Sequence, residues 1–93
     1  MKFFDWNPEK NEWLRKERGI TFEEVVFHLQ LGGLLDTIEN PNQKRYRGQR
    51  IFVVKVEGYV WLVPFMETEE AVFLKTIIPS RKMTKLYIGG EEK

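Results

Sequence analysis

The sequence predicts an α+β fold in which two N-terminal helices pack on a small antiparallel β-sheet, followed by a short basic C-terminal tail. Two helix-start signals lie in the first 25 residues, and apolar runs of strand length, separated by turn residues, fill positions 50–78. At 93 residues, with no internal repeat or low-complexity segment, residues 1–93 are expected to form a single domain.

The first helix is expected to begin at Pro8. Residues 2–5 are largely aromatic and compatible with a short strand, and Asn7 is a favourable N-cap directly before the proline. Gly19 should end this helix, because glycine readily adopts the left-handed conformation found at helix C-termini. Most side chains in between are charged, so the helix should pack on the domain through a narrow apolar stripe.

A capping box predicts the second helix. Thr21 and Glu24 have the required spacing, and apolar residues at helical intervals follow them. Ile20 and Val25 stand where a hydrophobic staple would place them. The paired glycines at positions 32–33 are expected to end the helix.

Four apolar segments of strand length follow the helices: residues 34–38, 51–56, 59–66 and 71–78. A turn at residues 40–43 and a basic loop at 44–49 separate the first two. Glu57-Gly58 is expected to form a two-residue hairpin turn. Pro64 suggests a bulge or a sheet edge, and Pro79 should stop the last strand.

Both faces of these strands are expected to be apolar over much of their length. The predicted faces of the last strand are Val72, Leu74 and Ile78 on one side and Phe73, Lys75 and Ile77 on the other. The two helices can cover one face of the sheet. The other face needs a tail, a partner chain or a ligand to cover it.

The composition excludes several classes of site. There is no cysteine, which excludes disulfides and thiolate chemistry, and the single histidine, His28, excludes a histidine-rich metal site. No apolar run has the length of a membrane span, and the N-terminal residues lack the apolar region of a signal peptide. We therefore expect a cytoplasmic protein without membrane association, metal or cofactor.

The charge is segregated along the chain, although the net charge is only +1. Residues 44–57 carry five basic side chains and one acid, and residues 75–90 carry four basic side chains and no acid. An acidic segment at residues 67–70 separates the two basic blocks. This pattern predicts a local positive surface that would attract an anion, phosphate above all.

Arginines in the two basic blocks are the first candidates for phosphate contacts. Arg81 and Lys82 follow directly after the last predicted strand, and Arg47 and Arg50 lie at the start of the sheet. A guanidinium group matches the geometry of a phosphate through two parallel hydrogen bonds. The alternative is that these side chains simply form a solvated basic loop and tail.

Lysines and tyrosines complete the candidate set. Lys75 could take part in proton transfer, or its stem could lie on apolar surface with its ammonium group in water. Tyr87 is a candidate catalytic phenol, and Tyr46 a platform for an unpaired base, although simple packing of the aromatic rings is the slightly favoured explanation for both. Further candidate RNA contacts are Lys44, Arg45, Lys82 and Lys85.

Three local motifs and one tyrosine, in this order, resemble the BrnT family of toxins. They are Phe4–Asn11 with its Asp-Trp-Asn-Pro core, Arg18–Glu24, Ile77–Lys82, and Tyr87. The family usually has Lys-His where this chain has Glu17-Arg18, and Ser-Ala where it has Pro79-Ser80, whereas Arg81 matches the family's arginine. The resemblance spans nearly the whole chain.

The resemblance implies a RelE-like fold and a type II toxin that cleaves RNA, with messenger RNA as the expected substrate, without a metal. It also implies a ribbon-helix-helix antitoxin as partner, with operator DNA bound only through that antitoxin. Two alternatives remain open from the residues. One is a catalytically inactive module that still binds the antitoxin, and the other is a small RNA-binding domain.

Overall fold

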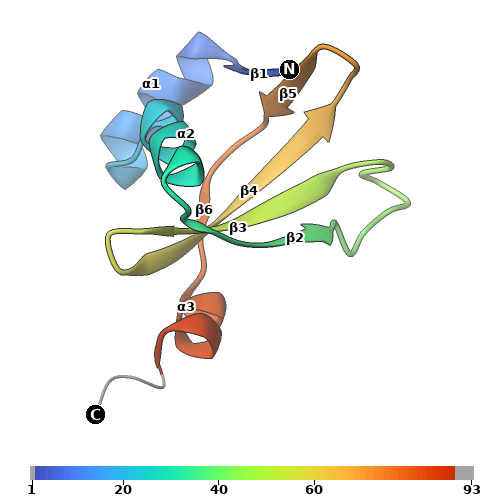
Figure 1. Ribbon diagram of the computed structural model, residues 1–93. Helices are drawn as coiled ribbons and strands as arrows, with labels where there is room; N and C mark the ends of the chain where they lie inside the picture. The colour runs from blue at the N-terminus through green and yellow to red at the C-terminus, as the bar shows by residue number, and fades with distance from the viewer. Residues whose placement is uncertain (1, 90–93) are drawn as a thin grey trace.

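The computed structural model describes residues 2–89 and contains three helices and a six-stranded mixed sheet. Five strands lie side by side in the order β1-β5-β4-β3-β2, and β6 also pairs with β4. The strands are β1 (Phe3–Trp6), β2 (Leu34–Glu39), β3 (Arg50–Val56), β4 (Tyr59–Glu67), β5 (Ala71–Leu74) and β6 (Ile78–Pro79). Figure 1 shows α1 and α2 on one side of the sheet and α3 on the other.

Both predicted N-terminal helices are confirmed, with the caps that their sequences indicate. In α1 (Pro8–Arg18) the Asn7 side chain accepts a hydrogen bond from the Lys10 amide, and Gly19 has a φ of 68°. In α2 (Phe22–Gln30) Thr21 and Glu24 form both bonds of the capping box. These caps depend on residues three positions apart, which is why the local sequence determines them.

The sheet is mixed, so the prediction of a wholly antiparallel sheet is wrong at one edge. Strand β1 runs parallel to β5, with Phe4 opposite Val72 and Trp6 opposite Leu74. This pairing brings Trp6 against Phe22 of α2, with ring centroids 5.5 Å apart. The strand propensity of β1 contains no information on the direction of a partner so distant in the chain.

The segment predicted as one strand over residues 71–78 is in fact two strands, β5 and β6, with an interruption at 75–77. The interruption reverses the side-chain alternation. Ile77 is fully buried in the core on the helix side, whereas Ile78 is 39% exposed. The predicted faces of these two isoleucines are therefore wrong, because a shift of one residue exchanges the two faces of a strand.

Pro64 explains where the interruption falls. It lies within β4, paired with Ile51 of β3 on one side, and its carbonyl accepts a hydrogen bond from the Lys75 amide at 2.8 Å on the other. In an antiparallel strand the carbonyl and amide of one residue point the same way, so the missing N–H faces the interruption between β5 and β6. Pro64 is thus not at a sheet edge; the irregularity lies in the neighbouring strand.

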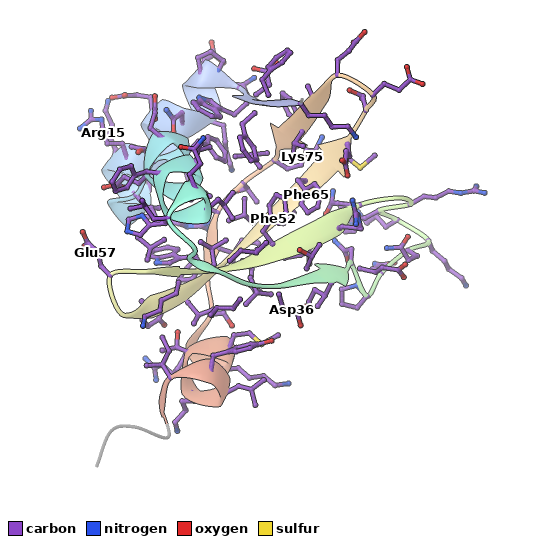
Figure 2. The ribbon with its side chains drawn as sticks, in the orientation of Figure 1. Arg15, Asp36, Phe52, Glu57, Phe65 and Lys75 are labelled. Carbon is purple, nitrogen blue, oxygen red and sulfur yellow. The ribbon has the colours of Figure 1, made fainter. Side chains whose placement is uncertain are left out.

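The main core lies between the sheet and helices α1 and α2. Phe52 and Phe65 stack at its centre with ring centroids 3.8 Å apart, and Figure 2 shows both on adjacent strands. Leu14 of α1 and Phe22 and Val25 of α2 are completely buried against this face. The hairpin at Glu57-Gly58 connects the two strands, and both of its residues have positive φ, as the turn type requires.

The basic tail is a helix, α3 (Arg81–Tyr87), which covers part of the second face of the sheet. Ser80 caps it by accepting a hydrogen bond from the Met83 amide. Thr84 fixes it to β4, because its hydroxyl accepts from the Val60 amide at 2.9 Å and donates to the Ser80 carbonyl at 2.7 Å. The apolar second face was expected to need a tail, a partner chain or a ligand to cover it, and the tail covers part of it.

Replacing Thr84 with valine should therefore weaken the attachment of α3. Valine keeps the shape but leaves the Val60 amide without its partner, so we expect a loss of about 1–3 kcal/mol in the free energy of unfolding. Chemical denaturation measures this loss. Thr84→Ser retains the hydroxyl and is the matched control; equal stability of wild type and the valine variant would contradict the prediction.

Candidate nucleic-acid interface

The loop between β2 and β3 is held by a network of side-chain amides. Asn40 donates through Nδ2 to Gln49 Oε1 at 2.7 Å, and its own Oδ1 accepts from the Asn42 amide at 3.0 Å. Gln43 donates through Nε2 to the carbonyls of Asn40 and Gln49, and its Oε1 accepts from the Gly48 amide. Much of the loop backbone is thus hydrogen-bonded within the loop, which fixes the conformation in which its cations are presented.

Three cations and a tyrosine project from this loop. Lys44, Arg45, Tyr46 and Arg47 are all exposed, and the Arg45 guanidinium carbon lies 5.5 Å from the centre of the Tyr46 ring. None of the three cations makes a salt bridge among the described residues. The predicted RNA contacts of this segment therefore form one group on one loop.

A groove lies beside this loop on the sheet face opposite α1 and α2. It has a volume of about 300 Å³, and its lining residues are Asn40, Tyr46, Gln49, Pro64, Lys75, Thr76 and Ile78. Tyr46 comes from the loop, whereas Lys75 comes from the interruption between β5 and β6. The structure therefore brings together two predicted site residues that are far apart in the sequence.

Lys75 is exposed, with its ammonium nitrogen 5.4 Å from the centre of the Phe73 ring. Figure 2 shows it beyond the end of β5, on the segment that leads to β6. It also borders a second, more open hollow with Trp13 of α1. Its predicted neighbour Ile77 points into the core instead, so Lys75 does not share a strand face with that residue.

Arg50 is engaged by an ion-pair network. Its guanidinium group pairs with Glu67, and Lys2 Nζ binds the same carboxylate at 2.6 Å. The hydrogen bond from Lys2, with a smaller contribution from Arg50, lowers the pKa of Glu67. The carboxylate thus occupies the position that a phosphate would take on Arg50, which makes this arginine a weaker candidate than the loop cations.

Helix α3 carries the second group of predicted residues. Arg81, Lys82 and Lys85 are exposed, and Arg81 and Lys82 are its first two residues. Tyr87 donates from its hydroxyl to Asp36 Oδ2 of β2 at 3.2 Å, and Figure 2 shows Asp36 on the α3 side of the strand. Partial burial, and then the bond to Asp36, raises the pKa of Tyr87.

The two basic groups do not converge on one point. Along β4, Arg50 stands opposite Phe65, whereas the Ser80 amide binds the Val60 carbonyl. At about 3.4 Å per residue, Arg50 and the start of α3 are about 17 Å apart along the strand. Lys75 lies between them, about 14 Å from Ser80 by the same measure. The candidate residues therefore do not form a single cluster: α3 lies on the second face of the sheet, whereas Arg50 lies over the Phe65 ring on the face that α1 and α2 cover.

The sequence did not identify the amide network of the loop or the role of Lys2. The Asn-Pro-Asn-Gln run was interpreted only as a turn, yet it supplies three of the amides that hold the loop. The signal in the sequence was the presence of four side-chain amides within ten positions, directly before strand β3: Asn40, Asn42, Gln43 and Gln49. Lys2 gave none, because its partner Glu67 comes from the far end of β4.

Comparison with family models, with curated proteins and with solved structures gives no match to this chain. Within residues 2–89, no group of three or more acidic, histidine or cysteine side chains is arranged to hold a metal ion. No helix in the same range is long and apolar enough to cross a membrane. The candidate site therefore has to be judged on its own geometry.

The raised pKa of Tyr87 predicts a loss of stability at alkaline pH. The unfolded chain gives up the phenolic proton near pH 10, before the folded protein does, so stability is complete below about pH 10 and falls as pH rises through the folded pKa. Melting temperatures across this range, for wild type and Tyr87→Phe, test this. The variant should lose less stability on the alkaline side; parallel curves would contradict the role of Tyr87.

Removing the Gln43 side chain should loosen the loop without unfolding the sheet. Gln43→Ala deletes three hydrogen bonds, including the one that the Gly48 amide donates. We expect the Gly48 amide to exchange with solvent at least about tenfold faster, the effect of about 1.4 kcal/mol of lost protection. Gln30→Ala, at an exposed position of α2, is the control and should leave this rate unchanged.

Proposed function

We propose that this protein is the toxin of a type II toxin–antitoxin pair, a metal-independent endoribonuclease that acts on messenger RNA in the cytoplasm. The observation that carries the proposal is the groove that Tyr46 and Lys75 both line, beside a loop whose cations have no salt-bridge partner within residues 2–89. A single RNA strand binds where an aromatic ring can stack on a base and cations can follow the phosphates. This groove offers both.

The order of elements supports a RelE-like assignment. Helices α1 and α2 precede the antiparallel strands β2, β3, β4 and β5, and a basic segment closes the chain. This is the order that the resemblance to BrnT toxins implies. Each of the three segments that carry the resemblance contains a helix cap. Asn7 caps α1, Thr21 caps α2, and Ser80 caps α3, which begins with Arg81.

Metal-free cleavage of RNA requires groups of three kinds. A base takes the proton of the 2′-hydroxyl, whose oxygen then attacks phosphorus; the bond to the 5′-oxygen breaks, and an acid protonates that oxygen. Cations stabilise the phosphate as its negative charge increases. We assign proton transfer to Lys75 at the groove and the cationic role at the reacting phosphate to Arg47 of the adjacent loop, whereas Arg81 of α3 contacts the phosphate backbone further along the strand. Tyr87, bound to Asp36, keeps its proton and holds α3 in place.

A ribbon-helix-helix antitoxin is the proposed protein partner, and operator DNA would be bound only through it. Support comes from three large apolar side chains that are exposed at the end of α2 and the start of β2: Phe27 is 57% exposed, Leu31 68% and Leu34 42%. Three large apolar side chains exposed close together in sequence are typical of a surface that binds protein. These side chains lie away from the groove.

The test of the proposal is expression in a bacterium, alone and together with the neighbouring reading frame. Alone, the protein should arrest growth and cleave transcripts, and the neighbour should prevent both. The purified protein should cleave RNA in excess EDTA and leave 2′,3′-cyclic phosphate ends. Arg81→Ala should reduce the cleavage rate about tenfold or more, because it removes a phosphate contact that positions the RNA strand for cleavage.

Arg15→Ala is the matched control for Arg81→Ala. Arg15 is exposed on α1, where it pairs with Glu12, and Figure 2 shows it on the outer side of that helix. Its loss should leave cleavage unchanged. Harmless expression alone, with intact transcripts, would rule out the toxin.

The spread of the cations favours a second candidate, an RNA-binding protein without catalysis. Arg50 is occupied by Glu67, and the loop and α3 cations lie apart rather than around one phosphate. Such a protein, whether a small RNA-binding domain or an inactive module that still binds the antitoxin, should bind RNA without cleaving it. Its RNA affinity should fall steeply with salt, since phosphate contacts release counterions.

A further inference from the structure

Gln49 is the one buried polar side chain in the described part of the chain, with 7% of its surface exposed. Its Oε1 accepts a hydrogen bond from Asn40, whereas its Nε2 donates to no described residue. Every fully buried side-chain nitrogen and oxygen of the described residues has a partner, so solvent must reach Nε2. Because Gln49 lines the groove, this donor opens into it.

The hydrogen-bond network fixes which end of the Gln49 amide faces outward. The backbone N–H of Asn42 can only donate, so the Asn40 atom that it meets must be the oxygen. The other end of the Asn40 amide is then a donor, and the Gln49 atom facing it must be Oε1. The NH2 group of Gln49 is therefore left for the groove, with two N–H donors and no acceptor beside them.

The rest of the groove suits a planar ring followed by an anion. Tyr46, Pro64 and Ile78 provide apolar walls, and Lys75 provides a cation at the rim. A volume of about 300 Å³ is at the lower end of small-molecule sites, so it can hold one ring system and not several. The Arg45 guanidinium, over the Tyr46 ring, adds a second cation next to the stacking surface.

We infer that this groove selects an unpaired RNA base that presents a ring carbonyl to Gln49, uracil above all. The carbonyl accepts from Gln49 Nε2, the ring packs on Tyr46, and the adjoining phosphate lies near Lys75. A base with an exocyclic amine at the same position would place a donor against the two donors of Gln49. The inference deepens the proposed function and rests on it, since it names the base that the groove recognises.

Two pairs of nucleotides test the carbonyl. UMP has a ring carbonyl beside a ring N–H where CMP has an amine beside a ring nitrogen acceptor, and IMP and AMP differ in the same way within rings of the same size. Each nucleotide is titrated into the ¹⁵N-labelled protein and followed by NMR. Binding in the groove should shift the amide signals of Gln49, Tyr46 and Lys75. UMP should bind about three- to tenfold more tightly than CMP, and IMP than AMP, the effect of one hydrogen bond.

Gln49→Glu tests the donor itself. It keeps the oxygen that faces Asn40 and replaces the NH2 group by a second oxygen, so the preference for the carbonyl member of each pair should disappear. Gln30→Glu makes the same change on the exposed side of α2 and should keep the wild-type preference. If the Gln49 variant does not fold, the two nucleotide pairs with wild-type protein still decide the question.

The outcomes separate this inference from the proposed function. Equal affinities within each pair, or shifts outside the groove, overturn the inference even if the protein cleaves RNA. A carbonyl preference without any RNA cleavage supports the base site and counts against the endoribonuclease. No binding of any nucleotide, with binding of a short peptide in the groove, overturns the inference and assigns the groove to protein.

Discussion

The structure depends on the fact that β3 and β4 are apolar on both faces. Val54 and Val63 face α1 and α2, whereas Val53 and Val60 are fully buried on the opposite side. A sheet with two apolar faces must be covered twice, because exposed patches of that size favour association. Helix α3 is therefore part of the fold and not an appendage, and the cations that it carries are positioned by the packing of the sheet.

Pro64 links the packing of the sheet to the candidate site. The N–H that it lacks would point toward the neighbouring strand, and at this point β5 ends. The chain then turns Ile77 into the core and leaves Lys75 and Ile78 on the other side, where they border the groove. The groove thus exists because the sheet is interrupted, and its position follows from one residue in the adjacent strand.

The sequence determined the features that depend on near neighbours. The helix caps at Asn7 and Thr21 and the hairpin after β3 were predictable, because each needs residues within a few positions. The direction of β1, the division of residues 71–78 and the docking of α3 depend on partners distant in the chain, and no local pattern carries them. The same holds for the site: its residue types were predictable, but the meeting of Tyr46 with Lys75 was not.

The pairing of the cations decides which of them can hold a phosphate. Arg50 must first separate from Glu67, and any phosphate there competes with that carboxylate. Among the described residues the loop cations have no such competitor, and the amide network fixes the conformation of the loop that presents them. Preorganised, unpaired charge gives more binding free energy than charge that must break a pair. Under the proposed function, an RNA strand would therefore contact the 44–47 loop and the groove before the cations of α3.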